Sequence, residues 1–305
     1  MKRVTSEKSD DASKKQKTTD PEKEIDDFLA NIQGSEMDSL EYFSAKSTLH
    51  IGLKNKKKVR LVFSDSVVKL ERDETNEVFS KSEAGTSQSE MISKYFQIII
   101  EKSADFLKNI EISSEDFPFS STNIKNCKNL ENLNISHNGD SFDLIKSGFL
   151  SQDTIFQIRE DISIHGFLLV GEMLDFEKIK AKNVSCDKVT GSVYDVLFNY
   201  LNKFQEDKVE NIFENIDLEM IPEEVEMVSD EEDENEEYYG YPFNFRRDDY
   251  PDYEILHQDF EALFGEFESG NEAEIDESDC SFQVSNKTNQ FKIECHGNSL
   301  HLEKS

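Results

Sequence analysis

The sequence contains no tryptophan, only five prolines, and no long hydrophobic run. Its longest apolar stretches, such as 96–100 and 167–170, are far shorter than the roughly twenty residues of a membrane helix. Lys2 and Arg3 follow Met1 without the apolar core of a signal peptide. We therefore expect a soluble intracellular protein, nuclear or cytoplasmic, that does not bind membranes.

Motifs for catalysis and metal binding are also missing. The four cysteines, Cys127, Cys186, Cys280 and Cys295, show no CxxC spacing, so we expect free and mostly buried thiols rather than zinc ligands. The sequence lacks GxxxxGK[ST], GxGxxG, HExxH and GxSxG, and its six histidines are isolated. We assign no catalytic, cofactor-binding or metal-binding residue and expect a non-enzymatic protein; a diverged enzyme is a third hypothesis.

Negative charge is abundant. Asp and Glu number 65 against 34 Lys and Arg, which gives a formal net charge of -31. Such a chain repels nucleic acids and anionic membranes and favours basic partners. Hydrophobic residues make up 36% and charged residues 32%, so we expect folded and disordered parts together.

Residues 1–20 are polar and are predicted to be a disordered tail. Two basic clusters separated by ten residues are typical of a bipartite nuclear localisation signal, although a generic solvated tail has the same composition. The residues of this signal would be Lys2, Arg3, Lys14, Lys15 and Lys17.

Residues 21–70 predict a short helix, 21–32, followed by a β-hairpin. Leu49, Ile51 and Leu53 alternate with polar residues and would pair with the alternating strand around Leu61, and a third strand would contain Leu70. Residues 71–90 turn polar and are predicted to be a linker, and an amphipathic helix follows.

Residues 91–221 carry a repeated pattern. Two short apolar ladders lie 23 residues apart, within the period of leucine-rich repeats, and predict two parallel strands. Their apolar residues are Leu107, Ile110 and Ile112, then Leu130, Leu133 and Ile135. Looser copies follow around Ile162 and Ile164, Phe176 and Ile179, and Ile216 and Leu218, with a long helix before the last.

The fold class predicted from this pattern is α/β, an irregular leucine-rich-repeat-like solenoid; an unrelated α/β layer is the alternative. The apolar ladder residues would form the core. Their neighbours Glu131, Asn132, Asn134 and Ser136 would supply a binding face, and Asn138 would bond to the backbone of a turn.

Residues 222–279 form an acidic insert, predicted to be largely disordered with one helix at 253–267. It is either a solvated loop or a contact for basic partners such as histones, and Ser229 suits an acidophilic kinase. The contact residues would be Asp230, Glu231, Glu232, Asp233, Glu234, Tyr238 and Tyr239. Residues 280–305 alternate strictly and predict an antiparallel β-meander that closes the domain.

Three stretches, "ADFLKNIEISS" with "CKNLENLNIS", "LDFEKIKAKNVSCDKVTGSVYDVLFNYLNKFQEDKVENIFENIDL" and "CSFQVSNKTNQFKIECHGNSLHLE", resemble the nematode F-box-associated proteins of type 2. The resemblance implies a repeat fold that binds proteins and, through an F-box, docking onto the adaptor of a ubiquitin ligase. The stretch "IDDFLANIQGSEMDSLEYFSAKSTLHI" resembles a degenerate F-box, which would dock through Phe28, Leu40 and Phe43, although the usual opening Leu-Pro is absent.

Two functions therefore stand as hypotheses. The first is a non-enzymatic protein-recognition module that needs no cofactor, with a divergent F-box-type substrate receptor as its specific form. The alternative is an acidic nuclear protein that binds basic partners such as histones.

Overall fold

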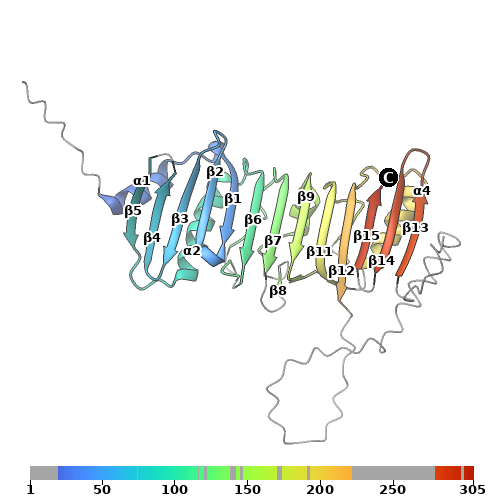
Figure 1. Cartoon of the computed structure of the whole chain (residues 1–305). Coiled ribbons are helices and arrows are strands. Elements are labelled where there is room, and N and C mark those ends of the chain that lie inside the picture. Colours follow the sequence, from blue (N-terminus) through green and yellow to red (C-terminus); the bar gives the residue numbers. More distant parts are fainter. Residues whose placement is uncertain are drawn as a thin grey trace, which may run out of the picture.

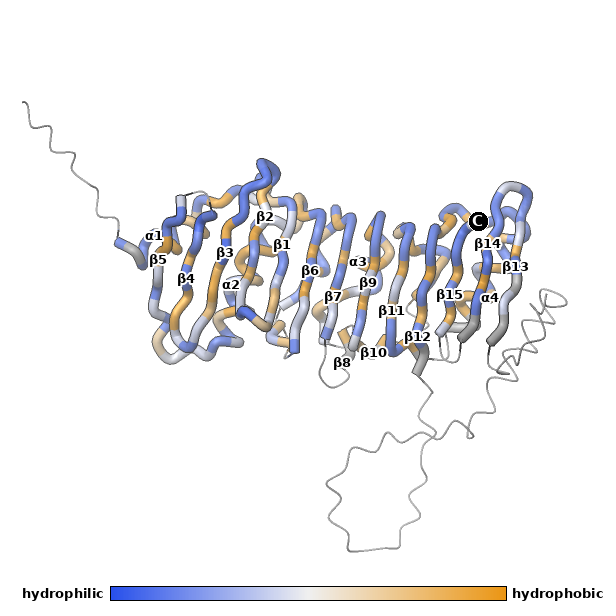
Figure 2. Tube along the Cα trace, in the orientation of Figure 1, coloured by the Kyte–Doolittle hydropathy of each residue, from blue (hydrophilic) through white to orange (hydrophobic). Residues whose placement is uncertain are grey.

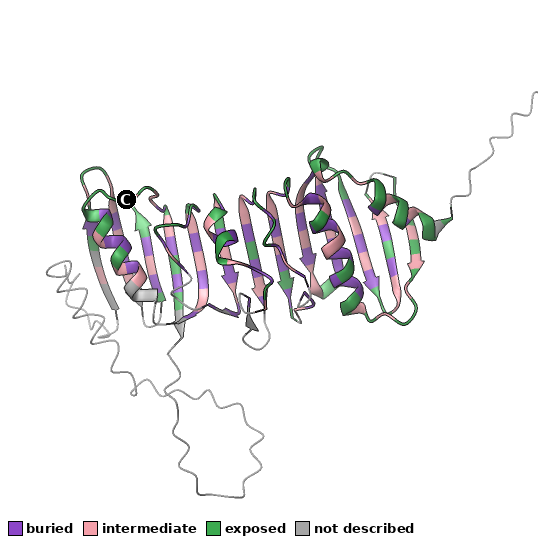
Figure 3. Ribbon diagram, turned by 180° about the vertical axis from the view of Figure 1, so that it is seen from behind, coloured by how far each residue is buried: buried purple, intermediate pink, exposed green. Residues whose placement is uncertain are grey.

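The body of the molecule is one 13-stranded sheet with its helices on a single face (Figures 1 and 3). The fold is therefore mixed α/β. The computed structural model describes residues 20–73, 75–115, 117–119, 122–137, 142–144, 147–169, 174–190, 193–221, 279–296 and 299–305.

The first five strands form the antiparallel part of the sheet. They are β1 (Met37–Phe43), β2 (Thr48–Leu53), β3 (Lys58–Ser64), β4 (Val67–Arg72) and β5 (Glu77–Ser82), with short 3-10 turns η1 (Gly34–Glu36) and η2 (Ser44–Lys46) around β1. The predicted hairpin is confirmed, because Leu49 pairs with Leu61 and Ile51 with Val59. The third strand, with Leu70, is confirmed as β4.

Two predictions for this part are wrong. Residues 71–90 are not a linker, because β4 runs to Arg72 and β5 occupies Glu77–Ser82. β5 is polar because it is the edge strand and most of its side chains are at least partly exposed. The segment after the first helix is also a strand, β1, rather than the continuation of a helical module.

Five parallel strands form what we call the central block. They are β6 (Asn109–Ser114), β7 (Asn132–His137), β9 (Asp161–His165), β11 (Asn183–Thr190) and β12 (Asn215–Ile221). The two predicted ladders pair in parallel with a 23-residue offset, Ile110 beside Leu133 and Ile112 beside Ile135. β1 joins the block by pairing in parallel with β6.

The predictions for the looser repeats are less accurate. Ile162 and Ile164 lie on β9 as predicted, but Phe176 and Ile179 are not on a strand. They are buried in the connection before β11, where Val184 and Cys186 supply the strand's core residues.

The predicted meander is confirmed as β13 (Asp279–Ser285), β14 (Gln290–His296) and β15 (Ser299–Lys304). It joins the central block through β15, which pairs antiparallel with β12. A separate two-stranded parallel ladder pairs β8 (Phe142–Asp143) with β10 (Phe167–Leu168). The tail 1–19, most of the acidic insert with its predicted helix, and Asn138 lie outside the described residues.

The helices cover the apolar face of the sheet (Figure 3). They are α1 (Pro21–Asn31), α2 (Gln88–Ser103), α3 (Gln152–Gln157) and α4 (Val193–Gln205). A capping box between Ser87 and Glu90 fixes the start of α2. Apolar residues recur along each strand in register with their neighbours, so one hydrophobic layer runs across the sheet (Figure 2).

Aromatic side chains fill the space between sheet and helices. Phe119 lies 4.4 Å from Phe96 of α2 and 5.1 Å from Tyr42 of β1, measured between ring centroids. A second group lies under α4, where Tyr200 is 5.3 Å from Phe213. The core therefore sits entirely on the helix side.

Candidate functional site: the open face of the sheet

No described helix covers the opposite face of the sheet, which we call the open face (Figures 1 and 3). Side chains alternate between the two faces of a strand, so each strand presents every second residue there. The helix-side positions are apolar and buried, while the open-face positions are mostly polar and partly exposed. A surface of this kind suits contact with a partner molecule.

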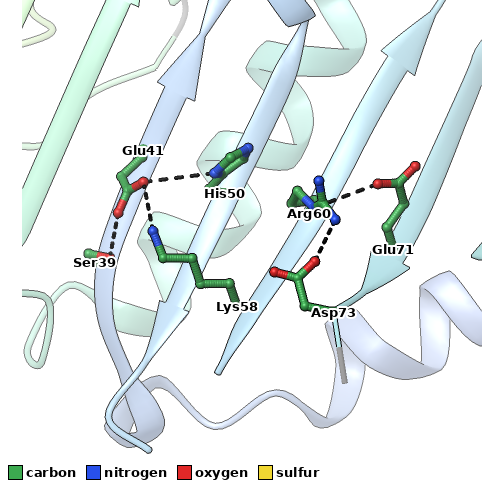
Figure 4. Close-up of polar contacts among 7 residues, drawn as sticks. All are labelled: Ser39, Glu41, His50, Lys58, Arg60, Glu71 and Asp73. Carbon is green, nitrogen blue, oxygen red and sulfur yellow. Dashed lines mark hydrogen bonds and ion pairs between the residues drawn. The ribbon is translucent and has the colours of Figure 1, made fainter. Parts of the chain in front are cut away.

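Charged side chains on β1 to β4 pair across the strands (Figure 4). The Glu41 carboxylate accepts a hydrogen bond from Ser39 Oγ at 3.2 Å and lies 3.4 Å from Lys58 Nζ. Arg60 lies 2.5 Å from Asp73 and 3.6 Å from Glu71. Each of these three carboxylates therefore has a cation beside it.

A glycine allows one of these pairs to form. Lys58 on β3 and Glu41 on β1 are separated by β2, where Gly52 lies opposite Lys58. A Cβ atom at Gly52 would come within 2.2 Å of Ser39 Oγ, so the position has no room for a side chain. The lysine therefore reaches over the intervening strand to Glu41.

The open face of the central block has a different composition. Most of its described side chains are short and polar. They are Asn109, Glu111, Ser113, Asn132, Asn134, Ser136, Asp161, Ser163, His165, Asn183, Ser185, Asp187, Asn215, Asp217 and Glu219. The predicted outward direction of Asn132, Asn134 and Ser136 is confirmed by this alternation with buried Leu133 and Ile135.

The first residue of every strand in the block is an asparagine or aspartate, and these residues form a ladder of side-chain hydrogen bonds with one interruption. Asn132 Nδ2 donates to Asn109 Oδ1 at 2.6 Å, Asn183 Nδ2 donates to Asp161 Oδ1 at 2.6 Å, and Asn215 Nδ2 donates to Asn183 Oδ1 at 2.8 Å. These five residues pair in register, so each side chain meets the equivalent one on the next strand. The ladder ties the strand starts together.

The ladder is interrupted between β7 and β9. Asp161 stands where the other strands carry asparagine, and its carboxylate has no N–H to donate. Asn132 Oδ1, its neighbour in register, is buried, and no described residue donates a hydrogen bond to it. Two acceptors therefore lie side by side at this one step.

Five carboxylates on the central block have no ion pair with a described lysine or arginine, although Asp187 and Asp217 lie beside histidines. They belong to Glu111, Asp161, Asp187, Asp217 and Glu219. Lys188, at an irregularity in β11, donates instead to the carbonyl of Gly166 at 3.4 Å. The central block is therefore the acidic part of the open face.

Three histidines lie beside carboxylates on neighbouring strands. His50 Nδ1 is 3.8 Å from Glu41, His165 Nδ1 is 3.7 Å from Asp187, and His301 contacts Asp217. Burial lowers the pKa of His50 below 6.5, and the nearby Glu41 opposes that effect. Within the described residues, no three His, Cys, Asp or Glu side chains are grouped so as to hold a metal ion.

The carboxyl ends of β7 and β9 meet at a glycine. Gly166 has φ +81°, and a Cβ there would lie 1.7 Å from the carbonyl oxygen of His137. Its N–H donates to Asp187 Oδ1. The buried ring of His137 stacks on Phe167, with 5.1 Å between centroids. Only a residue without a side chain fits this junction.

The predicted docking residues are not gathered on one surface. Leu40 lies on β1 with its side chain fully buried, which corrects the expectation that it docks a partner. Phe28 is half-buried on α1, and Phe43 lies at the end of β1 beside His50, 5.3 Å between ring centroids. The nuclear-signal residues, Ser229 and the acidic contact residues lie outside the described part of the chain.

Cys127 and Cys186 are free and buried, as predicted, and burial raises the pKa of each thiol to about 12. None of the described helices has the length and apolar character to cross a membrane. Searches with the chain against protein-family models, curated proteins and solved structures find no match. The assignment of function therefore depends on the open face itself.

Proposed function

We propose that this protein is a non-enzymatic recognition module that binds a protein partner on the open face. The observation that supports it is the one-sided cover of the sheet, because the described helices all lie on one face (Figures 1 and 3). The strand positions on the other face carry mostly polar residues. A broad rigid sheet holds such rows in fixed register, which suits recognition of an extended protein surface.

The finer proposal is that the central block is an irregular leucine-rich-repeat-like solenoid. Each strand repeats the pattern Asn or Asp, apolar, any residue, apolar. Ladder neighbours are separated by 23, 22 and 32 residues where they bond. Variable connections joined by a constant strand motif are typical of repeat proteins in which each unit contacts only its neighbours.

A role as a substrate receptor in ubiquitin ligation requires a second surface for the ligase adaptor. Because Leu40 is buried, that surface would include Phe28 of α1 and exclude β1. Immunoprecipitation of the full chain followed by detection of adaptor and cullin tests this form. Recovery of partners without either protein would contradict ligase docking and leave open-face recognition intact.

The alternative, an acidic protein that binds basic partners, is favoured by the net charge of -31 and by the unpaired carboxylates of the central block. In the sequence-based form of this hypothesis the contact lies within 222–279. Deletion of 223–278 separates the two: partner binding on the open face would survive, whereas binding through the insert would be lost.

The principal test places a bulky side chain on the open face. Asn134→Trp changes an exposed residue at the middle of β7, and Glu101→Trp, at an exposed position of α2, is the matched control on the helix side. We expect the first variant, and not the second, to lose co-purifying partners relative to the native chain, with both folded by circular dichroism. Identical partner sets for all three proteins would overturn the proposal.

A further inference from the structure

The central block differs from the rest of the open face because no described lysine or arginine forms an ion pair with its carboxylates; its one lysine, Lys188, donates to the Gly166 carbonyl instead. On β1 to β4, Lys58 and Arg60 neutralise the carboxylates beside them, and on β14 Lys292 lies 2.5 Å from Glu294. Between these flanks the open-face positions carry carboxylates and short neutral side chains. The sheet therefore presents an acidic centre between two margins where lysine or arginine lies beside the carboxylates.

The acidic centre is accessible over its whole width. Asp161, Asp217 and Glu219 are exposed, and Glu111 is partly exposed. Strands are spaced about 4.8 Å apart, so the four steps from β6 to β12 span roughly 19 Å, the length of about six extended residues. The neighbouring serine and asparagine side chains are short and do not project above the carboxylates. A polypeptide segment lying on this face would therefore contact the carboxylates directly.

A second feature of the same surface is a hydrogen-bond acceptor without a donor. Asn132 Oδ1 lacks a hydrogen-bond donor among the described residues, and its neighbour in register is the carboxylate of Asp161. Every other step of the ladder has a donor facing an acceptor. An ammonium or guanidinium group arriving over the exposed Asp161 carboxylate would supply the positive charge that is missing at this interruption.

We propose that the open face of the central block binds a lysine- or arginine-rich protein segment, with Glu111, Asp161, Asp217 and Glu219 as its principal contacts. This inference rests on the proposed function and names the chemistry of the partner. Charge complementarity selects it: nucleic acids and acidic peptides are repelled by these carboxylates, whereas a basic segment neutralises them and is steered by the net charge of -31.

The test uses the full chain and a synthetic peptide of alternating lysine and serine, twelve residues long. Glu111→Gln/Asp217→Asn/Glu219→Gln removes three open-face charges without altering shape. Asp27→Asn/Glu101→Gln/Glu210→Gln removes three exposed charges elsewhere and is the matched control. At low salt we expect the open-face triple variant to bind the peptide roughly fivefold to tenfold more weakly and the control to change by less than about twofold.

Location is measured by carbodiimide cross-linking, which joins lysine amines to nearby carboxylates, and mass spectrometry. We expect peptide cross-links at Glu111, Asp161, Asp217 or Glu219. Cross-links confined to 222–278, with the open-face triple variant binding like the native chain, would overturn the inference. Cross-links from Lys14, Lys15 or Lys17 of the chain's own tail to these carboxylates would also overturn it, because the face would already be occupied.

The two proposals fail in different ways. If Asn134→Trp abolishes partner binding but the open-face triple variant retains it, the open face recognises a protein that is not basic, and only this inference falls. If Asn134→Trp has no effect on partners, the proposed function falls as well.

Discussion

The antiparallel strands β1 to β4 and the central block expose the same face of one sheet but stabilise it differently. In the antiparallel part, Glu41, Arg60 and Glu71 lie within reach of opposite charges on neighbouring strands. In the central block the strands are linked by side-chain amides, and no described lysine or arginine pairs with the open-face carboxylates. Cross-strand ion pairs neutralise the charged side chains of a surface, whereas an amide ladder links the strands without neutralising the carboxylates beside it.

The largest effect is expected where the two regions are joined. Phe119 is fully buried and contacts both Tyr42 of β1 and Phe96 of α2. Phe119→Ala should lower the free energy of unfolding by about 3–5 kcal/mol, measured by urea denaturation, because it leaves a cavity. Phe106→Ala, at a phenylalanine that is 42% exposed, is the control and should cost about 1 kcal/mol or less. Equal effects would contradict the assigned core.

The second-largest effect is a difference in stability between alanine substitutions at two glycines in the connections of the central block. Gly166→Ala should destabilise the protein by about 3 kcal/mol or more, because it adds a backbone clash to an unfavourable φ. Gly148 has φ +78° with open space around it, so Gly148→Ala isolates the conformational cost, about 1 kcal/mol. Thermal melting of both variants measures the difference. Matching melting temperatures would show that the His137 carbonyl is not close to Gly166.

A smaller effect of opposite sign tests the ladder. Asp161→Asn provides the missing N–H for Asn132 Oδ1 while keeping an acceptor for Asn183 Nδ2. It should raise the free energy of unfolding by about 1 kcal/mol. Glu111→Gln removes a carboxylate from the same face without touching the ladder and should change stability by less. A loss of stability in Asp161→Asn would argue against the ladder's direction.

The smallest effect concerns pH in the antiparallel part. Because burial lowers the pKa of His50 below 6.5, the folded chain binds fewer protons than the unfolded chain just below that pH. Stability should therefore fall as pH decreases from 6.5 through the folded-state pKa. The charged neighbours Glu41, Lys58, Arg60 and Asp73 act in both directions. His50→Gln should reduce this slope in melting temperature against pH, and an unchanged slope would exclude His50 as its source.

Much of the fold was predictable because it follows from local alternation. Leu49 with Leu61, and Ile110 with Leu133, were identified because apolar residues at every second position indicate a half-buried strand. β5 was not, because an edge strand needs little apolar character. β1 was assigned to an F-box-like helical module since its polar and apolar residues do not alternate clearly enough to exclude a helix.

The candidate site was predicted only in part. Asn132, Asn134 and Ser136 were expected to face outward, but the ladder to Asn109, Asn183 and Asn215 was missed. Its signal was present: each strand of the central block begins with Asn or Asp directly before an apolar residue. The spacing between successive apolar ladders varies with the length of the connections, whereas the Asn or Asp residue marks the register of every strand. Ion pairs such as Lys58 with Glu41 depend on sheet order, which local sequence does not determine.

The attachment of the meander has a consequence for synthesis. β12 is not covered by the strand that follows it in sequence but by β15, and the contact between Asp217 and His301 spans 84 residues. While the chain emerges from the ribosome, the edge of β12 that faces away from β11 therefore stays unpaired until β15 has been synthesised. The intervening acidic residues 223–237 would keep growing chains apart by mutual repulsion during that interval.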